Sequence, residues 1–506
     1  LYRSTDGGAT WVFRWNIDDF WETLASSIVD PDVVMFGGVE LFRSTDGGAS
    51  FSLVNGWAEY YDDPVHKLHA DLPGIDVAWT PQGQEIHWIA TDGGLYKSVD
   101  RVASVTNVSL QNLGVSQYYT THTSVNDPTL ILAGAQDQGY QRSVGPPAGT
   151  LRDFEQLISG DYGHLTSSDG THQKIYSDYP GFILVQHGEL APQLTDFIDF
   201  PAEANHSWLP FILARPGNPD IVYLCADRIW RFRDVVPGGW SITSTAQDFT
   251  VAGGSYLTAL LISPLDVDRK IAITNSGVIW WTDQPSFDSF VLSPDTGPSS
   301  HYFYGTALEP SPDDPLVAYA GGSGYSGPAV WRTTDGGIDW TPVSGGLPPT
   351  LVYDLAFEEA TSGVLYAATE AGPFRLDPST DTWSSLDHPG LPLTIYWCVE
   401  AVPAAEIMRF GTYGRGIWDY HWGGATSVAA LPSRGGARIE SRPNPFVSGT
   451  TLVFATTRPG PVRLRVYDTA GRLVRDLADG NEGLGEHRRE WDGRDSGGRP
   501  VAAGVY

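Results

Sequence analysis

One short loop occurs several times in this chain, and a repeated loop limits the possible architecture more than any other feature of the sequence. RSTDGGATW (residues 3–11) recurs forty residues later as RSTDGGASF (43–51), and again as RTTDGGIDW (332–340). A divergent copy, YKSVDRVAS, occupies residues 96–104. In the three close copies an apolar–aromatic pair precedes the polar turn and an aromatic residue follows it. This pattern predicts a β-hairpin turn in a chain built from repeated units.

The residues of the loop have a structural explanation. The side chains of Ser4 and Asp6 can bond to backbone N–H groups of their own turn, and Gly7 and Gly8 allow positive φ. Trp11 begins the return strand and supplies a large ring for burial. The loop is therefore expected to stabilise a hairpin rather than to catalyse a reaction. The structural positions of the three close copies are Ser4, Asp6, Gly8 and Trp11, then Ser44, Asp46, Gly48 and Phe51, and then Thr333, Asp335, Gly337 and Trp340.

A second repeat consists of two alternating strands around a Pro/Asn/Asp turn, as in SIVDPDVVMFGG (27–38), ARPGNPDIVYLCA (214–226) and LEPSPDDPLVAYAGG (308–322). The chain is rich in turn formers and rings, with 57 Gly, 36 Pro, 18 Trp, 23 Tyr and 20 Phe, and long helical patterns are missing. The repeats recur roughly every 40–55 residues, the spacing of four-stranded propeller blades. We predict an all-β chain with a β-propeller of about 7–10 four-stranded blades, in one large ring or in two rings.

The repeated loop resembles the Asp-box, S/T-x-D-x-G-x-T-W, of bacterial-neuraminidase-repeat propellers, which include sialidases, sortilin-type domains and xyloglucanases. The string IMRFGTYGRGIWDYHW (407–422) resembles the terminal blade of these families. The resemblance implies that the box lies on the outer hairpin of a blade, away from any active site.

The charge is strongly acidic and unevenly distributed. The formal net charge is −29, which argues against a nucleic-acid partner because phosphate binding needs clustered Lys and Arg. From Ser433 onward there are 12 basic and 9 acidic residues, against 19 and 51 before it. We therefore predict a propeller over residues 1–422, a linker over 423–437 and a separate module over 438–506. The sequence contains no run of 18 apolar residues, so no membrane span is predicted. Cys225 and Cys398 are expected to be isolated buried thiols.

The C-terminal module has three alternating segments, TTLVFAT, VRLRVYD and HRREWDG, separated by Gly- and Pro-containing turns. This predicts a small antiparallel sandwich. Its sequence resembles the immunoglobulin-like tails of the flagellar hook-capping type and the related type IX secretion sorting tails. In those families a last strand follows G-V-Y, so the module is expected to stop one strand short. The resemblance implies export, a secretion or attachment machinery as partner, and a location outside the cell or on its outer surface.

Four strings between residues 66 and 180 carry the candidate site: LHADLPG (68–74), ATDGGLYKS (90–98), AGAQDQGYQ (133–141) and ISGDYGHL (158–165). They resemble H-A-D-x-H, N-D-G-G-[IV]-Y-x-S, G-x-Q-D-N-G and G-G-D-G of a widespread group of secreted repeat proteins. The sequence departs from the first three strings at Pro73 or Gly74, at Thr91 and at Gln138. The fourth string reads S-G-D-Y in place of G-G-D-G. The residues that carry over are His69, Asp71, Asp92, Gln136, Asp137 and Asp161.

The four strings fall at predicted strand ends, and strand ends of a propeller meet around its central channel. We therefore expect these residues to gather at one channel mouth. Clustered carboxylates with a His can bind Ca²⁺ or act as an acid/base pair. The catalytic candidates are Asp71, Asp137 and Asp161, and the ligand-binding candidates are His69, Asp92, Gln136, Asp137 and Asp161. Asp before Gly is also an ordinary turn residue, and that alternative stays open. His164, His172 and His187 are expected on a solvated face.

Two functions follow from these patterns. The first is a secreted or surface-displayed propeller that binds a polysaccharide, glycoprotein or surface protein without turnover. The second is a glycoside hydrolase whose paired carboxylates, with Asp71 and Asp161 as the pair to test, cleave a polysaccharide. The local strings of sialidases are missing, which argues against sialidase activity. A purely structural or adhesive stalk is a third hypothesis.

Overall fold

The computed structural model confirms the predicted fold class: the regular elements of its described residues are β-strands and two short 3-10 helices, η1 (Trp57–Tyr61) and η2 (Pro403–Ala405). The structure describes residues 1–17, 23–80, 82–109, 113–148, 151–188, 195–236, 239–300, 306–358, 363–386, 390–422, 439–442, 446, 449–456, 460–467, 472–483 and 485–501. The chain divides into two compact units, Leu1–Gly424 and Ala425–Tyr506. The predicted linker, 423–437, lies outside the described residues.

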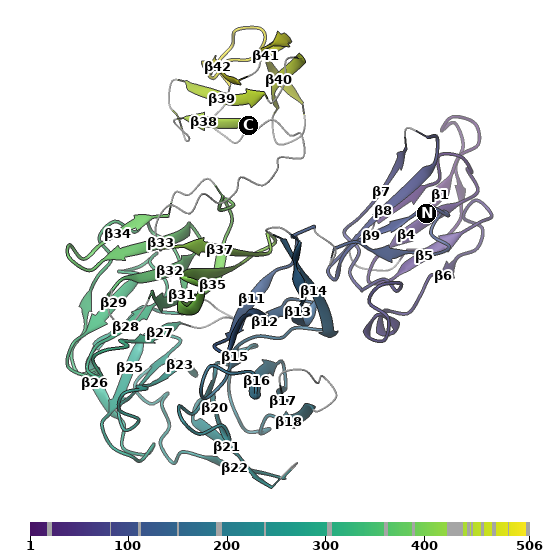
Figure 1. Cartoon of the computed structure of the whole chain (residues 1–506). Helices are drawn as coiled ribbons and strands as arrows, with labels where there is room; N and C mark the ends of the chain where they lie inside the picture. Colours follow the sequence, from purple (N-terminus) through teal and green to yellow (C-terminus); the bar gives the residue numbers. More distant parts are fainter. Residues whose placement is uncertain are drawn as a thin grey trace. The chain divides into compact units, whose positions relative to one another are not determined.

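Seven successive antiparallel sheets form a closed ring within the first unit. In the described residues six of them have four strands and the last has three. The first strand of each sheet contacts the first strand of the next, and β35 contacts β11, so the last sheet lies beside the first. In Figure 1 the inner strands β11, β15, β23, β27, β31 and β35 lie near the centre, with β14, β18, β22, β26 and β34 at the rim. The ring is a seven-bladed propeller spanning Tyr118–His421.

The strands of the first four blades are β11 (Tyr118–Ser124), β12 (Asp127–Ala135), β13 (Gly139–Ala148), β14 (Leu151–Ile158), β15 (Leu165–Thr166), β16 (Lys174–Tyr179), β17 (Phe182–His187), β18 (Thr195–Asp199), β19 (Ile212–Ala214), β20 (Ile221–Cys225), β21 (Ile229–Val236), β22 (Gly239–Ser244), β23 (Leu257–Ile262), β24 (Lys270–Thr274), β25 (Val278–Thr282) and β26 (Val291–Thr296). Those of the last three are β27 (Ala307–Pro310), β28 (Ala318–Gly321), β29 (Val330–Thr333), β30 (Thr341–Pro342), β31 (Val352–Phe357), β32 (Leu365–Thr369), β33 (Gly372–Asp377), β34 (Thr382–Ser385), β35 (Tyr396–Val402), β36 (Ile407–Thr412) and β37 (Ile417–His421).

Each pair of neighbouring blades buries its own apolar layer. The blade β19–β22, for example, packs Val222 and Phe232 against the preceding blade and Tyr223 and Cys225 against the following one. The alternation of side chains along β20 supplies both faces, which explains why all five of its residues are buried. Cys225 and Cys398 are both buried and free, as predicted.

Polar side chains on the inner strands tie several blades to the next one in the ring. The Asp354 carboxylate on β31 accepts the backbone N–H of Val399 on β35 at 2.9 Å, and Glu400 accepts that of Thr123 on β11 at 2.9 Å. A register shift between Val352 and Asp354 accompanies this arrangement, and β11, β23 and β35 have shifts at the equivalent place. Inner-strand N–H groups that lack a ladder partner are satisfied in this way.

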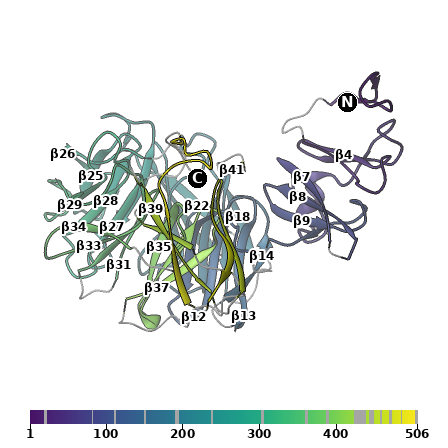
Figure 2. The same cartoon turned by 90° about the horizontal axis from the view of Figure 1, so that it is seen from above.

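Three sheets precede the ring. They are the hairpin β1 (Tyr2–Arg3) and β2 (Val12–Phe13), the sheet β3 (Thr23–Ser26), β4 (Val34–Gly37), β5 (Leu41–Ser44) and β6 (Ser52–Leu53), and the sheet β7 (Gly74–Trp79), β8 (Glu85–Thr91), β9 (Gly94–Ser98) and β10 (Thr106–Asn107). The two four-stranded sheets share a core and contact each other through β3 and β7, as neighbouring blades do. In Figure 2 the strands β4, β7, β8 and β9 form a group of their own.

In three four-stranded sheets the repeated loop joins the third and fourth strands. These are the close copies between β5 and β6 and between β29 and β30, and the divergent copy between β9 and β10. In the copy after β5, the Ser44 hydroxyl accepts the Gly48 N–H at 2.9 Å. The Asp46 carboxylate accepts the N–H and the hydroxyl of Ser50 at 2.9 and 2.6 Å. The first copy bonds in the same way, and the hydroxyl of Ser50 lowers the pKa of Asp46 to about 2. The loop is a hairpin staple held by its own side chains.

One of the differences in the third copy yields a prediction. Where the first two copies have Thr10 and Ser50, the third has Asp339, which places a second carboxylate near Asp335. We expect Asp339→Thr to raise the free energy of unfolding by about 1 kcal/mol, because a hydroxyl can donate to Asp335 as in the other copies. Denaturant unfolding measures the change. Asp339→Ala removes the charge without adding a donor and should give a smaller gain; equal gains would show that the hydroxyl contributes nothing.

The C-terminal unit contains two sheets. One is formed by β38 (Ile439–Arg442), β39 (Thr450–Thr456) and β42 (Gly485–Trp491), and the other by β40 (Gly460–Tyr467) and β41 (Leu473–Glu482). Phe454 and Trp491 of the first sheet and Leu464 and Val466 of the second are buried. Inward-facing residues alternate with exposed ones along β40, the pattern of a sheet with one covered face.

Candidate functional site

The predicted site residues lie on four loops that come together in the first unit. His69 and Asp71 precede β7, Asp92 lies in the β8–β9 turn, Asp137 lies in the β12–β13 turn, and Asp161 follows β14. We name Asp71, Asp92, Asp137 and Asp161 the carboxyl cluster. Two of its members come from the first blade of the ring and two from the sheet that precedes the ring.

Hydrogen bonds and one close side-chain contact connect these loops. The Asp137 backbone N–H donates to Asp161 Oδ1 at 3.2 Å, and the Asp92 N–H donates to the carbonyl oxygen of Asp71 at 3.2 Å. His69 Nε2 lies 4.0 Å from Asp137 Oδ1. Gln138 Nε2 donates to the carbonyl oxygen of Gly93 at 3.1 Å, which ties the β12–β13 turn to the β8–β9 turn. The arrangement brings residues about 70 positions apart in the sequence into one cluster.

Not every predicted residue contributes its side chain to the contacts between the loops. Gln136 contributes a backbone N–H to the carbonyl oxygen of Gln117 at 2.9 Å, whereas the neighbouring Gln138 is the residue whose side chain bridges the loops. Gln138 is buried. Gln138 stands where the resembled string has Asn, and nothing in the sequence indicated that its side chain bridges the loops.

Burial and mutual repulsion change the protonation of the cluster. Burial raises the pKa of Asp137 to about 8, with Asp161, Asp92 and Asp71 adding to the shift. Burial also raises the pKa of Asp92 to about 6, helped by Asp71 and Asp161, and raises that of Asp161. Burial lowers the pKa of His69. At pH 7 the His69–Asp137 contact therefore joins two uncharged groups, and Asp92 is ionised.

Two cluster members occupy the left-handed backbone region. Asp71 has a φ of 59° and Asp137 a φ of 58°. Asp tolerates this region better than most residues because its short polar side chain can bond locally. The turn interpretation of Asp137 therefore holds alongside any role in ligand binding.

Ca²⁺ binding was one of the two roles considered for the clustered carboxylates. Among the described residues no group of three or more His, Cys, Asp or Glu side chains has an arrangement that could hold a metal ion.

An aromatic surface lies beside the cluster. Trp57 and Tyr61 of η1 are 47% and 43% exposed, and their rings contact edge to face with centroids 5.7 Å apart. The pKa of Tyr61 is raised by burial first and then by Tyr179, Asp161 and Asp137, so these groups lie within electrostatic reach. Tyr179 stacks on Phe182 with centroids 4.6 Å apart. Phe182 in turn meets Phe197, which is 55% exposed, at 5.2 Å. We name these five residues the aromatic strip.

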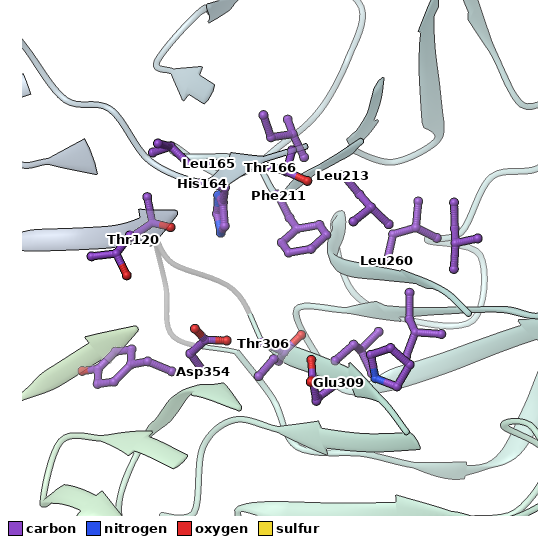
Figure 3. Close-up of a pocket in the computed structure, with 18 residues that line it drawn as sticks. Thr120, His164, Leu165, Thr166, Phe211, Leu213, Leu260, Thr306, Glu309 and Asp354 are labelled. Carbon is purple, nitrogen blue, oxygen red and sulfur yellow. The ribbon is translucent and has the colours of Figure 1, made fainter. Parts of the chain in front are cut away.

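The middle of the ring contains a separate cavity of about 300 Å³. Figure 3 shows His164, Asp354 and Glu309 among its lining residues. The residues of the carboxyl cluster are not part of this lining. The structure thus gathers the predicted acids, but at the junction of the β7–β10 sheet with the first blade rather than in the central cavity.

His172 and His164 do not lie on the predicted solvated face, whereas His187 is partly exposed. His172 is buried and its Nε2 lies 3.0 Å from the carbonyl oxygen of His122. His164 lines the central cavity, with Nδ1 3.3 Å from Oδ1 of the fully buried Asp178. His187 pairs with Asp196 at 3.1 Å. Asp354 and Glu309 were not predicted from the sequence. The feature that could have indicated them is an acidic residue inside an otherwise apolar strand, as in VYDLAF and ALEP.

These observations define the chain as a β-propeller with a C-terminal immunoglobulin-like unit. Residues 448–506 match the model of the FlgD Ig-like domain. A search of curated proteins found no match. No helix in the described part of the chain is long and apolar enough to cross a membrane.

Many solved structures are similar to the chain, and two are given as examples. One is YCF48 from Cyanidioschyzon merolae, with 12% identity, a TM-score of 0.45 and coverage of 62% of this chain and 97% of that chain. The other is the Cps50 (Swd1) beta-propeller domain of Myceliophteria thermophila, with 10% identity, a TM-score of 0.45 and coverage of 60% and 95%. At these identities the similarity concerns the fold alone.

Proposed function

We propose that this chain is an extracellular or cell-surface propeller that binds a glycan at the carboxyl cluster and the aromatic strip. The observation that carries the proposal is the exposure of Trp57 and Tyr61 next to the partly buried carboxyls of Asp137 and Asp161. Sugar rings present C–H faces that pack on aromatic rings and hydroxyls that bond to carboxyl groups. Exposed aromatic surface beside convergent polar groups is the usual chemistry of a ligand site.

Export belongs to the same proposal. It is supported by the match of residues 448–506 to the FlgD Ig-like domain and by the resemblance of that module to sorting tails. The resemblance of the repeated loop to the Asp-box agrees with a place among glycan-active propellers. The partner we infer is a polysaccharide, glycoprotein or surface protein, with the C-terminal unit engaging the secretion or attachment machinery.

A glycan array followed by titration of the bound polysaccharides tests the site. We expect Tyr61→Ala to weaken binding by about tenfold or more, because one stacking platform is lost. Trp79→Ala is the matched control, since Trp79 is 49% exposed on β7, at the strand end remote from Asp71. Unchanged affinity of the Tyr61 variant, or equal losses in both variants, would refute the assignment of the site.

The second candidate function is glycoside hydrolysis, and one observation favours it. Asp137 with a pKa of about 8 is protonated at pH 7, while Asp92 with a pKa of about 6 is ionised. A proton donor and an ionised carboxylate side by side are what acid/base cleavage of a glycosidic bond requires. New reducing ends from a bound polysaccharide, lost in Asp137→Asn while binding persists, would establish hydrolysis. Absence of new ends from every bound polysaccharide would leave binding alone.

A further inference from the structure

The cavity in the middle of the ring is built by strands from six blades. Its lining comes from the inner strands β11, β15, β19, β23, β27 and β31, together with His164, Phe211 and Thr306, each just before a strand. It is distinct in every lining residue from the carboxyl cluster and the aromatic strip. A volume of about 300 Å³ lies at the small end of ligand pockets, so an occupant must be a small molecule.

The lining has two chemically different parts. Phe211, Leu213 and Leu260 belong to an apolar part, while His164, Asp354 and Glu309 carry the ionisable groups. In Figure 3 the side chains of His164 and Asp354 point from opposite walls into the same space. Among the described lining residues there is no Lys or Arg. Two carboxyl groups on a cavity wall without Lys or Arg favour a positively charged or donor-rich ligand.

The ionisable groups are held in place from outside the cavity. His164 Nδ1 lies 3.3 Å from Oδ1 of Asp178, which is fully buried, and the imidazole packs edge on against Phe211 with centroids 5.1 Å apart. Asp354 accepts the N–H groups of Leu355 and Val399, each at 2.9 Å. Glu309 Oε1 accepts the N–H of Phe357 at 3.4 Å. Groups fixed in this way need no reordering when a ligand binds.

We propose that this cavity binds a small organic cation, an ammonium or guanidinium group on a short aliphatic body. The cationic head lies between Glu309 and Asp354, and the aliphatic body packs on Phe211, Leu213 and Leu260. This proposal is independent of glycan binding, because it uses none of the residues proposed for that function.

The protonation of the two carboxyls supports the proposal and supplies a signature. Burial raises the pKa of Glu309 to about 8, with Asp354 adding to the shift. Burial also raises the pKa of Asp354 to about 7, with His164 opposing and Glu400 adding. At pH 7, before a cation binds, Glu309 is therefore mostly protonated and Asp354 is partly protonated. A bound ammonium ion favours the carboxylate, so a carboxyl proton passes to the buffer as the cation enters.

The alternative is that both carboxyls only join neighbouring blades, since each accepts a backbone N–H from the next inner strand. A purely structural carboxyl binds no added amine and releases no proton on its addition. Its replacement would change stability alone. Proton release on amine binding therefore separates the two explanations.

Calorimetric titration of the full chain at pH 7 with butylamine and agmatine tests the proposal, with 1-butanol and butyrate as neutral and anionic probes of similar size. We expect binding of the amines only, with release of about one proton per cation, measured from the dependence of the heat on the ionisation enthalpy of the buffer. Binding of 1-butanol as tightly as butylamine would overturn the proposal, as would silence from both amines.

Two substitutions locate the binding. Glu309→Gln keeps an oxygen to accept the Phe357 N–H and should weaken amine binding by about tenfold or more. Glu358→Gln is the control, because Glu358 is a half-buried carboxylate that accepts the Tyr366 hydroxyl at 3.0 Å but lies outside the cavity lining. Circular dichroism checks that both variants are folded. Unchanged amine affinity in folded Glu309→Gln would refute the site, whatever the outcome of the glycan experiments.

Discussion

Replacing Arg409 by Met is expected to lower the free energy of unfolding of the propeller unit by about 3 kcal/mol. The Arg409 side chain is 4% exposed, and it forms a two-pronged ion pair with Asp419, with N···O distances of 2.8 and 2.9 Å. Its third nitrogen donates to the Thr123 hydroxyl at 2.5 Å. Thr123 belongs to the first blade and Arg409 to the last, so this network joins the two ends of the ring. Denaturant unfolding of the full chain measures the loss.

Arg332→Met is the matched control for ring closure. Arg332 also pairs through two nitrogens with one carboxylate, that of Asp381, at 2.7 and 3.0 Å, but the two side chains are 27% and 44% exposed. Water screens such a pair, so the expected loss is about 0–1 kcal/mol. Similar losses in both variants would mean that the Arg409 network adds nothing beyond an ordinary surface pair.

Replacing Asp137 by Asn is expected to change the free energy of unfolding in a pH-dependent way. The difference between variant and parent shifts in favour of the variant as the pH rises from 4 to 8, and it is about 2–4 kcal/mol larger at pH 8 than at pH 4. In the native chain the pKa of Asp137 is raised to about 8 from an ordinary value of 3.8. Between these pH values the unfolded chain has lost this proton and the folded chain keeps it, so stability falls as pH rises. Asn mimics the protonated carboxyl and tolerates the φ of 58°, and it therefore removes this fall.

Asp127→Asn provides a control with the opposite sign. Hydrogen bonds from the Thr129 side chain and backbone lower the pKa of Asp127, so its carboxylate stabilises the folded chain above pH 4 and loses that effect as the solution is acidified. The Asp127 variant should therefore be less stable than the parent at neutral pH. Parallel stability curves for the parent and the Asp137 variant across this range would show that Asp137 is not held protonated by the fold.

The members of the carboxyl cluster could be predicted from the sequence, but their position in the fold could not. Strings around His69, Asp92, Asp137 and Asp161 marked those residues as candidates, and they lie on adjoining loops. Their expected position, around the axis of one ring, is not where the structure has them. The repeats are similar along the whole chain, so the pattern alone does not tell which sheets close into a ring and which precede it.

The residues of the central cavity were not identified from the sequence for a related reason. Glu309 and Asp354 are single acids within short apolar strands, and they become neighbours only because β27 and β31 are adjacent inner strands. The aromatic strip likewise draws on η1, β16, β17 and β18, whose rings look like ordinary core residues until their exposure is known.

The sequence by itself determined the local structure: hairpins stapled by Ser/Thr–Asp–Gly turns, alternating strands of blade length and a separate basic tail module. These features depend on contacts between residues a few positions apart, which a short string specifies completely. Only the tertiary structure decided that seven sheets close between β11 and β35, and which side chains face the axis, the junction or solvent. Closure joins residues more than 270 positions apart, as between Thr123 and Glu400, and such pairings follow from how all the blades pack together.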